Sequence, residues 1–337
     1  MRRHLTPFRI AGGLVACLVA TAAILYSIPS SEYLLLPDIA HPVAPLVHVQ
    51  GARSAQGPGA IYFLDVFERR ASELESLFPW IHPDGTLVPA AAIVPPCSTA
   101  REANQVARQE MTFSQRVAAA VALEHLGYRV RVRPLGVIVS QLVAGTHAPC
   151  RLQPMDVIVA VDGTPTPTIA ALRGVLRKVK PGQVVSLRVR RAGRVRTVRV
   201  RTVADPQLPG QALVGFAPDQ AARITLPLRV SIDVSGVGGP SAGLAFALEV
   251  LAKLGRDVTR GYRVAATGEM ELTGAVAPIG GVRQKVIDAQ RAHVDVLLVP
   301  AGANASVARR YAGRLHVIAV RSFDQAVRAL ASLPPKR

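Results

Sequence analysis

Ser241 lies in a glycine-rich turn directly before a strongly apolar segment, residues 244–254. Proline one position earlier favours the start of a helix, and the free N–H groups of a first helical turn stabilise negative charge. A serine in such a turn is suited to attack a carbonyl carbon while backbone amides hold the oxyanion that forms. The turn residues expected to provide this environment are Gly239, Pro240 and Ala242.

Lys285 lies on an otherwise apolar stripe of a predicted helix. The stripe has helical spacing and consists of Val282, Lys285, Val286, Ala289 and Ala292. Burial can lower the pKa of a lysine from about 10.4 by about 3–5 units. The neutral amine could then take a proton from a serine hydroxyl, as in Ser-Lys catalysis. The alternative is a lysine whose stem packs on the stripe while its amine reaches solvent.

Three motifs in order carry a family resemblance: Gly-Pro-Ser-Ala-Gly at 239–243, Thr-Gly-Glu at 267–269 and Pro-Ile-Gly-Gly-Val-x-x-Lys at 278–285. With them, the region from about residue 230 to 330 resembles the proteolytic domain of the Lon protease family. The resemblance implies that Ser241 is the nucleophile, Lys285 the general base, and Thr267 a hydrogen-bonding neighbour that orients the lysine. Many Lon enzymes carry an acidic residue three positions before the serine, where this chain has Gly238.

A second unit, residues 134–203, combines a glycine-led strand, a turn-strand-turn segment and a helical pattern over residues 169–179. It resembles a PDZ domain of the bacterial protease-associated kind, with Met155 where the family usually has glycine. Such domains add an extended peptide as a strand and hold its terminal carboxylate on backbone N–H groups. The resemblance implies a site for peptide C-termini at Leu135, Gly136, Val137 and Ile138.

The N-terminus predicts a membrane anchor. Residues 10–28 are almost continuously apolar, about the length that crosses a bilayer. Arginines precede this run and acidic residues follow it, which predicts a cytoplasmic N-terminus and an extracytoplasmic body in contact with membrane lipid. A cleaved signal peptide is the alternative.

These features predict an α+β protein that combines a Lon-type proteolytic domain with a PDZ domain after one transmembrane helix. The expected boundaries are a cytoplasmic tail (1–9), the membrane helix (10–28), a linker (29–60), a strand-loop-helix region (61–133), the PDZ domain (134–203) and the proteolytic domain (204–332). Residues 111–115 are similar to a segment of Lon proteolytic domains. We therefore expect the PDZ unit to be inserted into a proteolytic domain that begins near Leu46 and resumes near Leu213. A separate small domain before the PDZ unit is the alternative.

The chain of 337 residues has a net charge of +18, and arginines alternate with apolar residues around Ala192-Gly193. This alternation predicts a β-hairpin with an arginine face, either solvated or attracted to anionic lipid headgroups. Motifs for nucleic-acid or metal binding do not accompany it, so we expect no nucleic acid, metal or cofactor. Cys97 and Cys150 could form a disulfide or remain unpaired, and the sequence leaves both open.

The favoured function is a serine endopeptidase that cleaves unfolded or flexible polypeptides. The sequence has no G-x-x-x-x-G-K-[ST] motif, so we expect cleavage without ATP. The Lon resemblance suggests a ring-shaped homo-oligomer. One alternative is a catalytically silent scaffold that binds peptides through the PDZ unit. Another is an α/β-hydrolase, because Ser241 also fits G-x-S-x-G and could pair with His316 and either Asp288 or Asp295.

Overall fold

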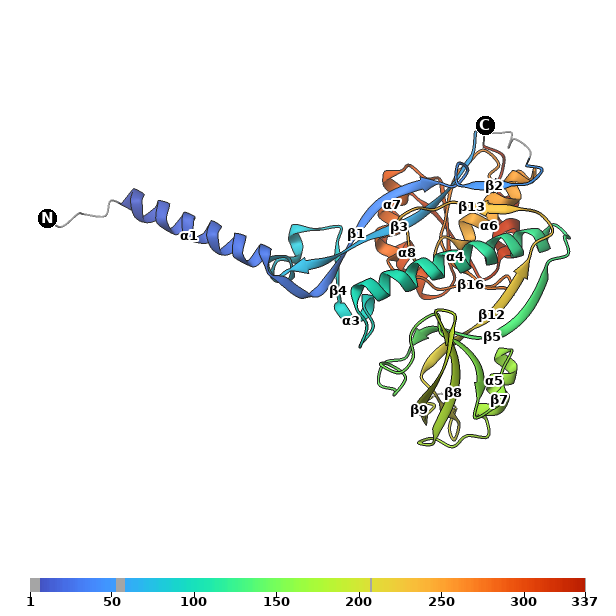
Figure 1. Cartoon of the computed structure of the whole chain (residues 1–337). Helices are drawn as coiled ribbons and strands as arrows, with labels where there is room; N and C mark the ends of the chain where they lie inside the picture. Colours follow the sequence, from blue (N-terminus) through green and yellow to red (C-terminus); the bar gives the residue numbers. More distant parts are fainter. Residues whose placement is uncertain (1–6, 53–57, 207, 337) are drawn as a thin grey trace.

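A long two-stranded ribbon joins an N-terminal helix to the body of the protein. The computed structural model describes residues 7–52, 58–206 and 208–336, with side chains from residue 11 onward. Helix α1 (Pro7–Ser27) projects away from the body, and β1 (Pro29–Pro42) and β3 (Ala60–Ser72) form the ribbon (Figure 1).

The prediction of a transmembrane helix over residues 10–28 is wrong for the part of the chain that the structure describes. A helix needs about 20 apolar residues to cross a bilayer. Within the described residues, no helix combines the length and the apolar character that a membrane span requires. The predicted extracytoplasmic localisation of the protease body depended on this span, so that prediction is wrong as well.

The larger unit is built on a six-stranded sheet with the order β18-β17-β14-β3-β1-β4. The further strands are β4 (Thr86–Pro89), β14 (Arg263–Ala266), β17 (Val296–Pro300) and β18 (His316–Val320). Strands β3, β14, β17 and β18 are parallel, whereas β1 is antiparallel to both β3 and β4. Residues from both ends of the chain therefore share one sheet. The expected linker over residues 29–60 includes β1, which buries Leu34 and Leu35.

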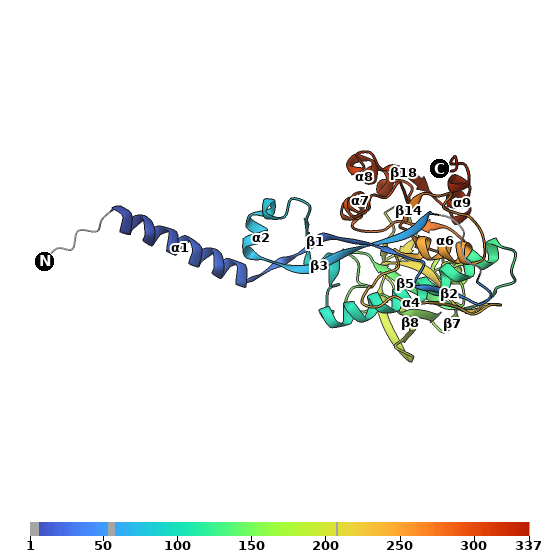
Figure 2. The same ribbon diagram turned by 90° about the horizontal axis from the view of Figure 1, so that it is seen from above.

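Helices cover both faces of this sheet, as Figure 2 shows. The helices on one face are α4 (Ala100–His125), α6 (Gly243–Lys253) and α9 (Phe323–Ala331), and those on the other are α7 (Val282–Arg291) and α8 (Ala303–Tyr311). Alternate residues along a strand face opposite ways. In β14, Val264 and Ala266 accordingly pack with α6, and Ala265 packs with α7. The nearly uniform apolar sequence of α6 follows from its burial, because residues 243–252 are all buried.

The PDZ-like unit has its own sheet, with the order β12-β5-β6-β8-β9 and β7 beside β6. Its elements are β5 (Arg131–Leu142), β6 (Val157–Val161), β7 (Thr164–Pro165), α5 (Ile169–Leu176), β8 (Val184–Arg191), β9 (Arg194–Arg201) and β12 (Phe216–Thr225). A separate apolar core, which includes Val137, Leu172 and Phe216, holds the unit together. Strands β8 and β9 form the predicted arginine-rich hairpin.

Short elements complete the fold: β2 (Val47–Val49), α2 (Glu73–Leu77), a 3₁₀ helix (Pro79–Ile81), α3 (Ala90–Ile93), β10 (Val203–Ala204), β11 (Ala212–Leu213), β13 (Val230–Ile232), β15 (Glu269–Met270) and β16 (Val276–Ala277). The long helix α4 begins at a capping box, in which Thr99 and Glu102 satisfy each other's backbone N–H groups. The helix ends just before Gly127, which takes the left-handed conformation common at helix ends (φ 83°).

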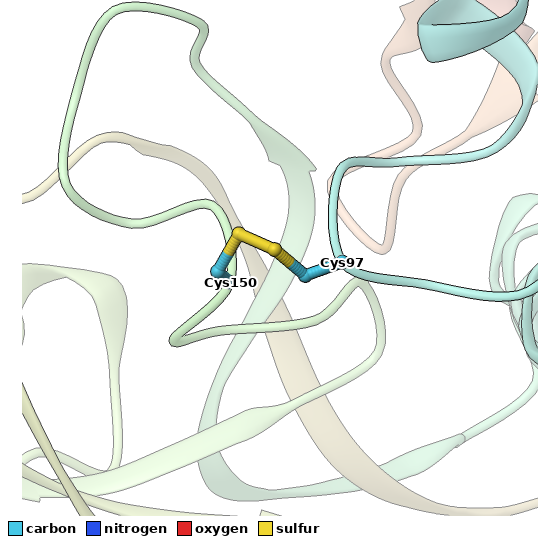
Figure 3. The surroundings of a disulfide bond; sticks show 2 residues. All are labelled: Cys97 and Cys150. Atoms are coloured by element: carbon cyan, nitrogen blue, oxygen red, sulfur yellow. A yellow bond between two sulfur atoms is a disulfide. The ribbon is translucent and has the colours of Figure 1, made fainter.

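Cys97 and Cys150 form a disulfide, which settles the question that the sequence left open (Figure 3). Cys97 lies between α3 and α4, and Cys150 lies in the PDZ-like unit between β5 and β6. The bond therefore ties this unit to the segment that leads into α4. Its sequence separation of 53 residues defines the loop that the bond closes.

We expect reduction of this disulfide to lower the free energy of unfolding by about 3–4 kcal/mol, because the open chain gains conformational entropy when unfolded. Urea unfolding of wild type, with and without reductant, and of Cys97→Ser would measure the difference. Cys17, the free cysteine of the described residues, supplies the control: Cys17→Ser should leave the reductant effect intact. Equal stability of wild type and Cys97→Ser would refute the expectation.

Candidate active site

The side chains of Ser241 and Lys285 meet between two helices. Ser241 precedes α6, and Lys285 lies in the first turn of α7, with its Nζ 2.7 Å from Ser241 Oγ. The start of α7 fits closely against the sheet because Gly281 has no side chain. A Cβ at this position would come within 2.5 Å of Val66. The structure thus brings together the serine turn and the lysine helix that the sequence singled out.

Lys285 is buried, with only 3% of its surface exposed. Burial lowers the pKa of its amine to about 8, although the negative charges of Asp65, Asp288 and Glu68 favour the protonated form. An amine with this pKa is neutral in a useful fraction of molecules near neutral pH. The alternative of a solvent-reaching amine is excluded by this burial.

Thr267 connects the serine to the lysine. It follows β14 and is fully buried. Its Oγ1 donates to the backbone oxygen of Ser241 at 3.2 Å and accepts from Lys285 Nζ at 3.3 Å. The amide of Gly268 donates to the same Ser241 oxygen at 2.8 Å. Thr267 thus holds both the lysine amine and the backbone of Ser241.

The turn before Ser241 differs in detail from its prediction. Helix α6 begins at Gly243, with Ala242 at its N-cap, so Pro240 lies in the preceding turn rather than at the first helical position. The amide of Gly239 donates to the backbone oxygen of Ala107 on α4 at 2.8 Å. This bond occupies the Gly239 N–H, which the sequence had assigned to the oxyanion environment, so of the predicted turn residues Ala242 is left to supply an amide there.

Helix α4 braces the serine turn in a way that the sequence did not reveal. A Cβ on Gly238 would lie 2.8 Å from the Cβ of Ala107, so glycine permits the close contact where many Lon enzymes have an acid. Ser114 Oγ donates to the backbone oxygen of Pro240 at 3.0 Å, and a Cβ on Gly243 would meet that Oγ at 2.8 Å. The periodic pattern of α4 shows an apolar face but not which helix it meets.

A cavity of about 280 Å³ opens beside Ser241. One wall comes from the PDZ-like unit, through Ile138, Ser140, Gln141 and Met155. The other wall belongs to α4 and the larger unit. The two units therefore form this cavity jointly.

Three carboxyl groups line the same cavity: Glu110 on α4, Asp219 on β12 and Glu269 on β15. Burial raises the pKa of Glu110 and that of Glu269 to about 7, and it also raises the pKa of Asp219. Glu110 and Glu269 therefore gain negative charge near neutral pH. No motif in the sequence points to these carboxyl groups, because they come from three distant segments.

The predicted peptide-binding strand of the PDZ-like unit is paired along both edges. Strand β12 pairs with β5 from Gly136 to Leu142, and β6 pairs with Val137 and Ile138 on the other side. The Gly136 amide donates to the backbone oxygen of Pro167 at 3.1 Å. A peptide that adds a strand needs an open sheet edge, and β12 lies along that edge of β5.

Gln220 fastens β12 to the start of α5. Its Nε2 donates to the backbone oxygens of Gly136 at 2.9 Å and Pro167 at 3.0 Å, and its Oε1 accepts from the amide of Ile169 at 3.3 Å. Strand β12 therefore lies between β5 and α5. This is the place where the ligand of a PDZ domain would otherwise add as a strand.

The alternative Ser-His-Asp site does not assemble. Thr267 and Ser241 lie at the carboxyl end of the parallel strand β14, whereas His316 begins β18 at the opposite end of the sheet and is exposed. Asp295 Oδ2 accepts from Arg263 N and Lys336 Nζ. Of the two sites considered for Ser241, the Ser-Lys pair is the one whose side chains lie within hydrogen-bond distance.

Comparison with known protein families agrees with this geometry. Residues 230–332 match the model of the Lon protease (S16) C-terminal proteolytic domain, and residues 125–202 match the model of the PDZ domain. The chain carries a Lon-type proteolytic domain and a PDZ domain. The Lon-type domain is that of a serine-type endopeptidase.

Curated relatives are similar over about a quarter of the chain. Lon protease 1 of Herpetosiphon aurantiacus is 41% identical over 86 residues, covering 26% of this chain and 10% of the relative. Lon protease of Aquifex aeolicus is 36% identical over 87 residues, covering 26% and 11%. The chain thus spans about a tenth of the length of these relatives. A solved PDZ domain of an SdrC-like protein from Listeria monocytogenes is 19% identical, with a TM-score of 0.23, covering 25% of this chain and 87% of that chain.

Proposed function

We propose that this protein is a serine endopeptidase that cleaves unfolded or flexible polypeptides without ATP. The observation that carries the proposal is the 2.7 Å contact between Lys285 Nζ and Ser241 Oγ in a buried site beside a cavity. A catalytically silent scaffold would not need a buried lysine with a lowered pKa at a serine.

In the proposed mechanism, Lys285 takes the proton from Ser241 Oγ as that oxygen attacks the scissile carbonyl carbon. The amide beside the nucleophile, that of Ala242, stabilises the oxyanion. Lys285 then returns the proton to the leaving amine, and the acyl-enzyme is hydrolysed by water through the same base. Thr267 acts as a positioning residue, since it contacts the lysine amine and the serine backbone.

The cavity favours a flexible substrate. Because its walls belong to both domains and its volume is about 280 Å³, a short extended segment can enter and a folded domain cannot. Cleavage of casein, an unfolded protein, in the presence of apyrase tests the proposal. We expect the same rate with apyrase and with added ATP, and no cleavage of a stably folded protein. Dependence on ATP, or no cleavage of casein, would contradict it.

We also propose that the PDZ domain is inserted into the proteolytic domain. The pairing of β3 with β14 supports the insertion. Strand β3 precedes the PDZ unit in the chain and β14 follows it, yet both belong to the sheet of the larger unit. The ring assembly suggested by the Lon resemblance is likewise a proposal, which light scattering of the purified protein would test.

For the PDZ domain, we propose that β12 acts as its built-in ligand. A free C-terminus from a substrate or regulator must then displace β12 to reach the site at Leu135–Ile138. Because Asp219 on β12 lines the catalytic cavity, this displacement would alter the cavity wall. The PDZ domain would in this way couple peptide binding to the protease site.

Gln220→Ala should therefore bind peptides with a free, apolar C-terminal residue about tenfold more tightly than wild type, because β12 loses three hydrogen bonds. Fluorescence anisotropy with a labelled peptide measures this, and the C-terminal amide form should bind much more weakly. Gln109→Ala, an exposed change on α4, is the matched control. Equal affinity of Gln220→Ala and wild type would contradict a built-in ligand.

A further inference from the structure

Three side chains with metal-binding atoms converge on the ribbon formed by β1 and β3. They are Asp38, His41 and Asp65, and one ligand atom from each lies within 4.8 Å of the others. His41 Nε2 lies 3.3 Å from Asp65 Oδ1. The two atoms nevertheless make no hydrogen bond, either with each other or with another described residue. The His41 ring stacks on Phe63 with centroids 4.8 Å apart, which fixes its orientation.

An irregularity in β1 brings these residues together. Pro37 pairs with Val66 and Ala40 pairs with Leu64, so two residues of β1 oppose Asp65 alone. This is the arrangement of a β-bulge. Residues three apart on a regular strand face opposite ways. The extra residue brings Asp38 and His41 to the same face, beside Asp65.

A buried, unpaired carboxylate lies next to this cluster. Asp288 on α7 is 1% exposed, and neither of its carboxylate oxygens has a hydrogen-bond partner among the described residues. Helix α7 packs against both β1 and β3. Burial raises the pKa of Asp288 to about 7, and the charges of Asp65 and Asp38 add to this rise, while the nearby Asp38 backbone N–H and Arg291 oppose it. Buried unpaired carboxylates are costly unless a cation or donor accompanies them.

We propose that Asp38, His41 and Asp65 bind one divalent transition-metal cation, Zn²⁺ or Mn²⁺, with the Asp288 carboxylate beside it. Two carboxylates with an imidazole suit these ions better than Mg²⁺ or Ca²⁺, which prefer oxygen ligands alone. Tetrahedral ligand atoms at about 2.1 Å from zinc lie about 3.4 Å apart. The ligand atoms of the three side chains lie within 4.8 Å of one another, so small side-chain rotations would bring them to this spacing. The side chain of His41 is 29% exposed and that of Asp65 17%, so the cluster lies near the surface, while His41 Nε2 and Asp65 Oδ1 are themselves buried.

The site can be tested on the full chain after chelator treatment and dialysis. Titration with ZnCl₂ and with MnCl₂, followed by calorimetry, should show one saturable site for at least one of these ions. The ion that binds should also raise the melting temperature of the protein. His41→Ala and Asp38→Asn should each weaken binding about tenfold or more, and Mg²⁺ and Ca²⁺ should bind much more weakly.

The matched control is His48→Ala, which removes an exposed histidine that faces Asp233 at 3.9 Å, without a third ligand among the described residues. It should bind the ion as wild type does. Circular dichroism and the melting temperature of the metal-free variants verify folding, and Asp38→Asn keeps the shape of the side chain. Absence of saturable Zn²⁺ or Mn²⁺ binding to wild type would overturn the proposal. So would unchanged affinity in both His41→Ala and Asp38→Asn.

Discussion

Ser241→Ala and Lys285→Ala should each lower the rate of peptide cleavage by about 10³-fold or more, to a similar residual level. The two groups act as one unit, so removing either removes nucleophilic attack, and the double variant should be no worse than the singles. Burial of Lys285 excludes bulk water from its amine, so another base cannot easily replace it. Initial rates on a fluorogenic peptide, measured with chelator present, would show this.

Two further variants separate the possible bases. Lys285→Arg should be as inactive as Lys285→Ala, because arginine keeps its proton at any usable pH. His316→Ala should keep nearly full activity, since His316 is exposed at the opposite end of the sheet. An active Lys285→Ala together with an inactive His316→Ala would refute the Ser-Lys mechanism.

Thr267→Ala should have an intermediate rate. It removes the hydroxyl that contacts Lys285 Nζ and the Ser241 backbone, but it leaves both reacting groups in place. We expect the turnover number to fall more than the Michaelis constant changes, as befits a positioning residue. Thr273→Ala, on the exposed turn after β15, is a matched control.

The sequence predicts the chemistry of this protein better than its architecture. Ser241 and Lys285 stand out because a lysine on an apolar helical stripe and a serine in a glycine-proline turn are both unusual. The burial of Lys285 follows from local periodicity alone. By contrast, β1 was expected to be linker, since Pro37 and Pro42 obscure its pattern of alternating burial.

The remaining differences arise from contacts between distant segments. Strand β12 pairs with β5 about 80 residues earlier, and nothing in the local pattern of β12 indicates that it fills the PDZ edge. Ser114 and Glu110 reach the active site only because α4 crosses the serine turn. Periodicity identifies the buried face of a helix, whereas its partner depends on the packing of the whole domain.

Peptide cleavage should rise steeply with pH and level off above about pH 9. The base must be neutral, and burial lowers the pKa of Lys285 to about 8. The neutral fraction is then about 1% at pH 6, about 10% at pH 7 and about 90% at pH 9. The pH dependence of kcat/KM reports this pKa in the free enzyme.

The same shift links pH to folding. Because the pKa of Lys285 is lower in the folded than in the unfolded protein, the folded state binds fewer protons between about pH 8 and pH 10.5. The Lys285 contribution to stability is therefore unfavourable below pH 8, by about 3 kcal/mol, and improves as pH rises through this window. Lys285→Met should remove the penalty, so its free energy of unfolding at pH 7 should exceed that of wild type.

The cavity carboxyls titrate near the same range, and the experiment must separate them from the lysine. Burial raises the pKa of Glu110 and that of Glu269 to about 7, so their ionisation could also shape the profile. Glu110→Gln and Glu269→Gln should alter any inflection near pH 7 and retain the rise toward pH 9. Glu68→Gln removes a negative charge that raises the pKa of Lys285, so it should move the midpoint of that rise to lower pH. A flat profile from pH 6 to 9 in wild type, or a rise that disappears in Glu110→Gln, would show that Lys285 is not the titrating base.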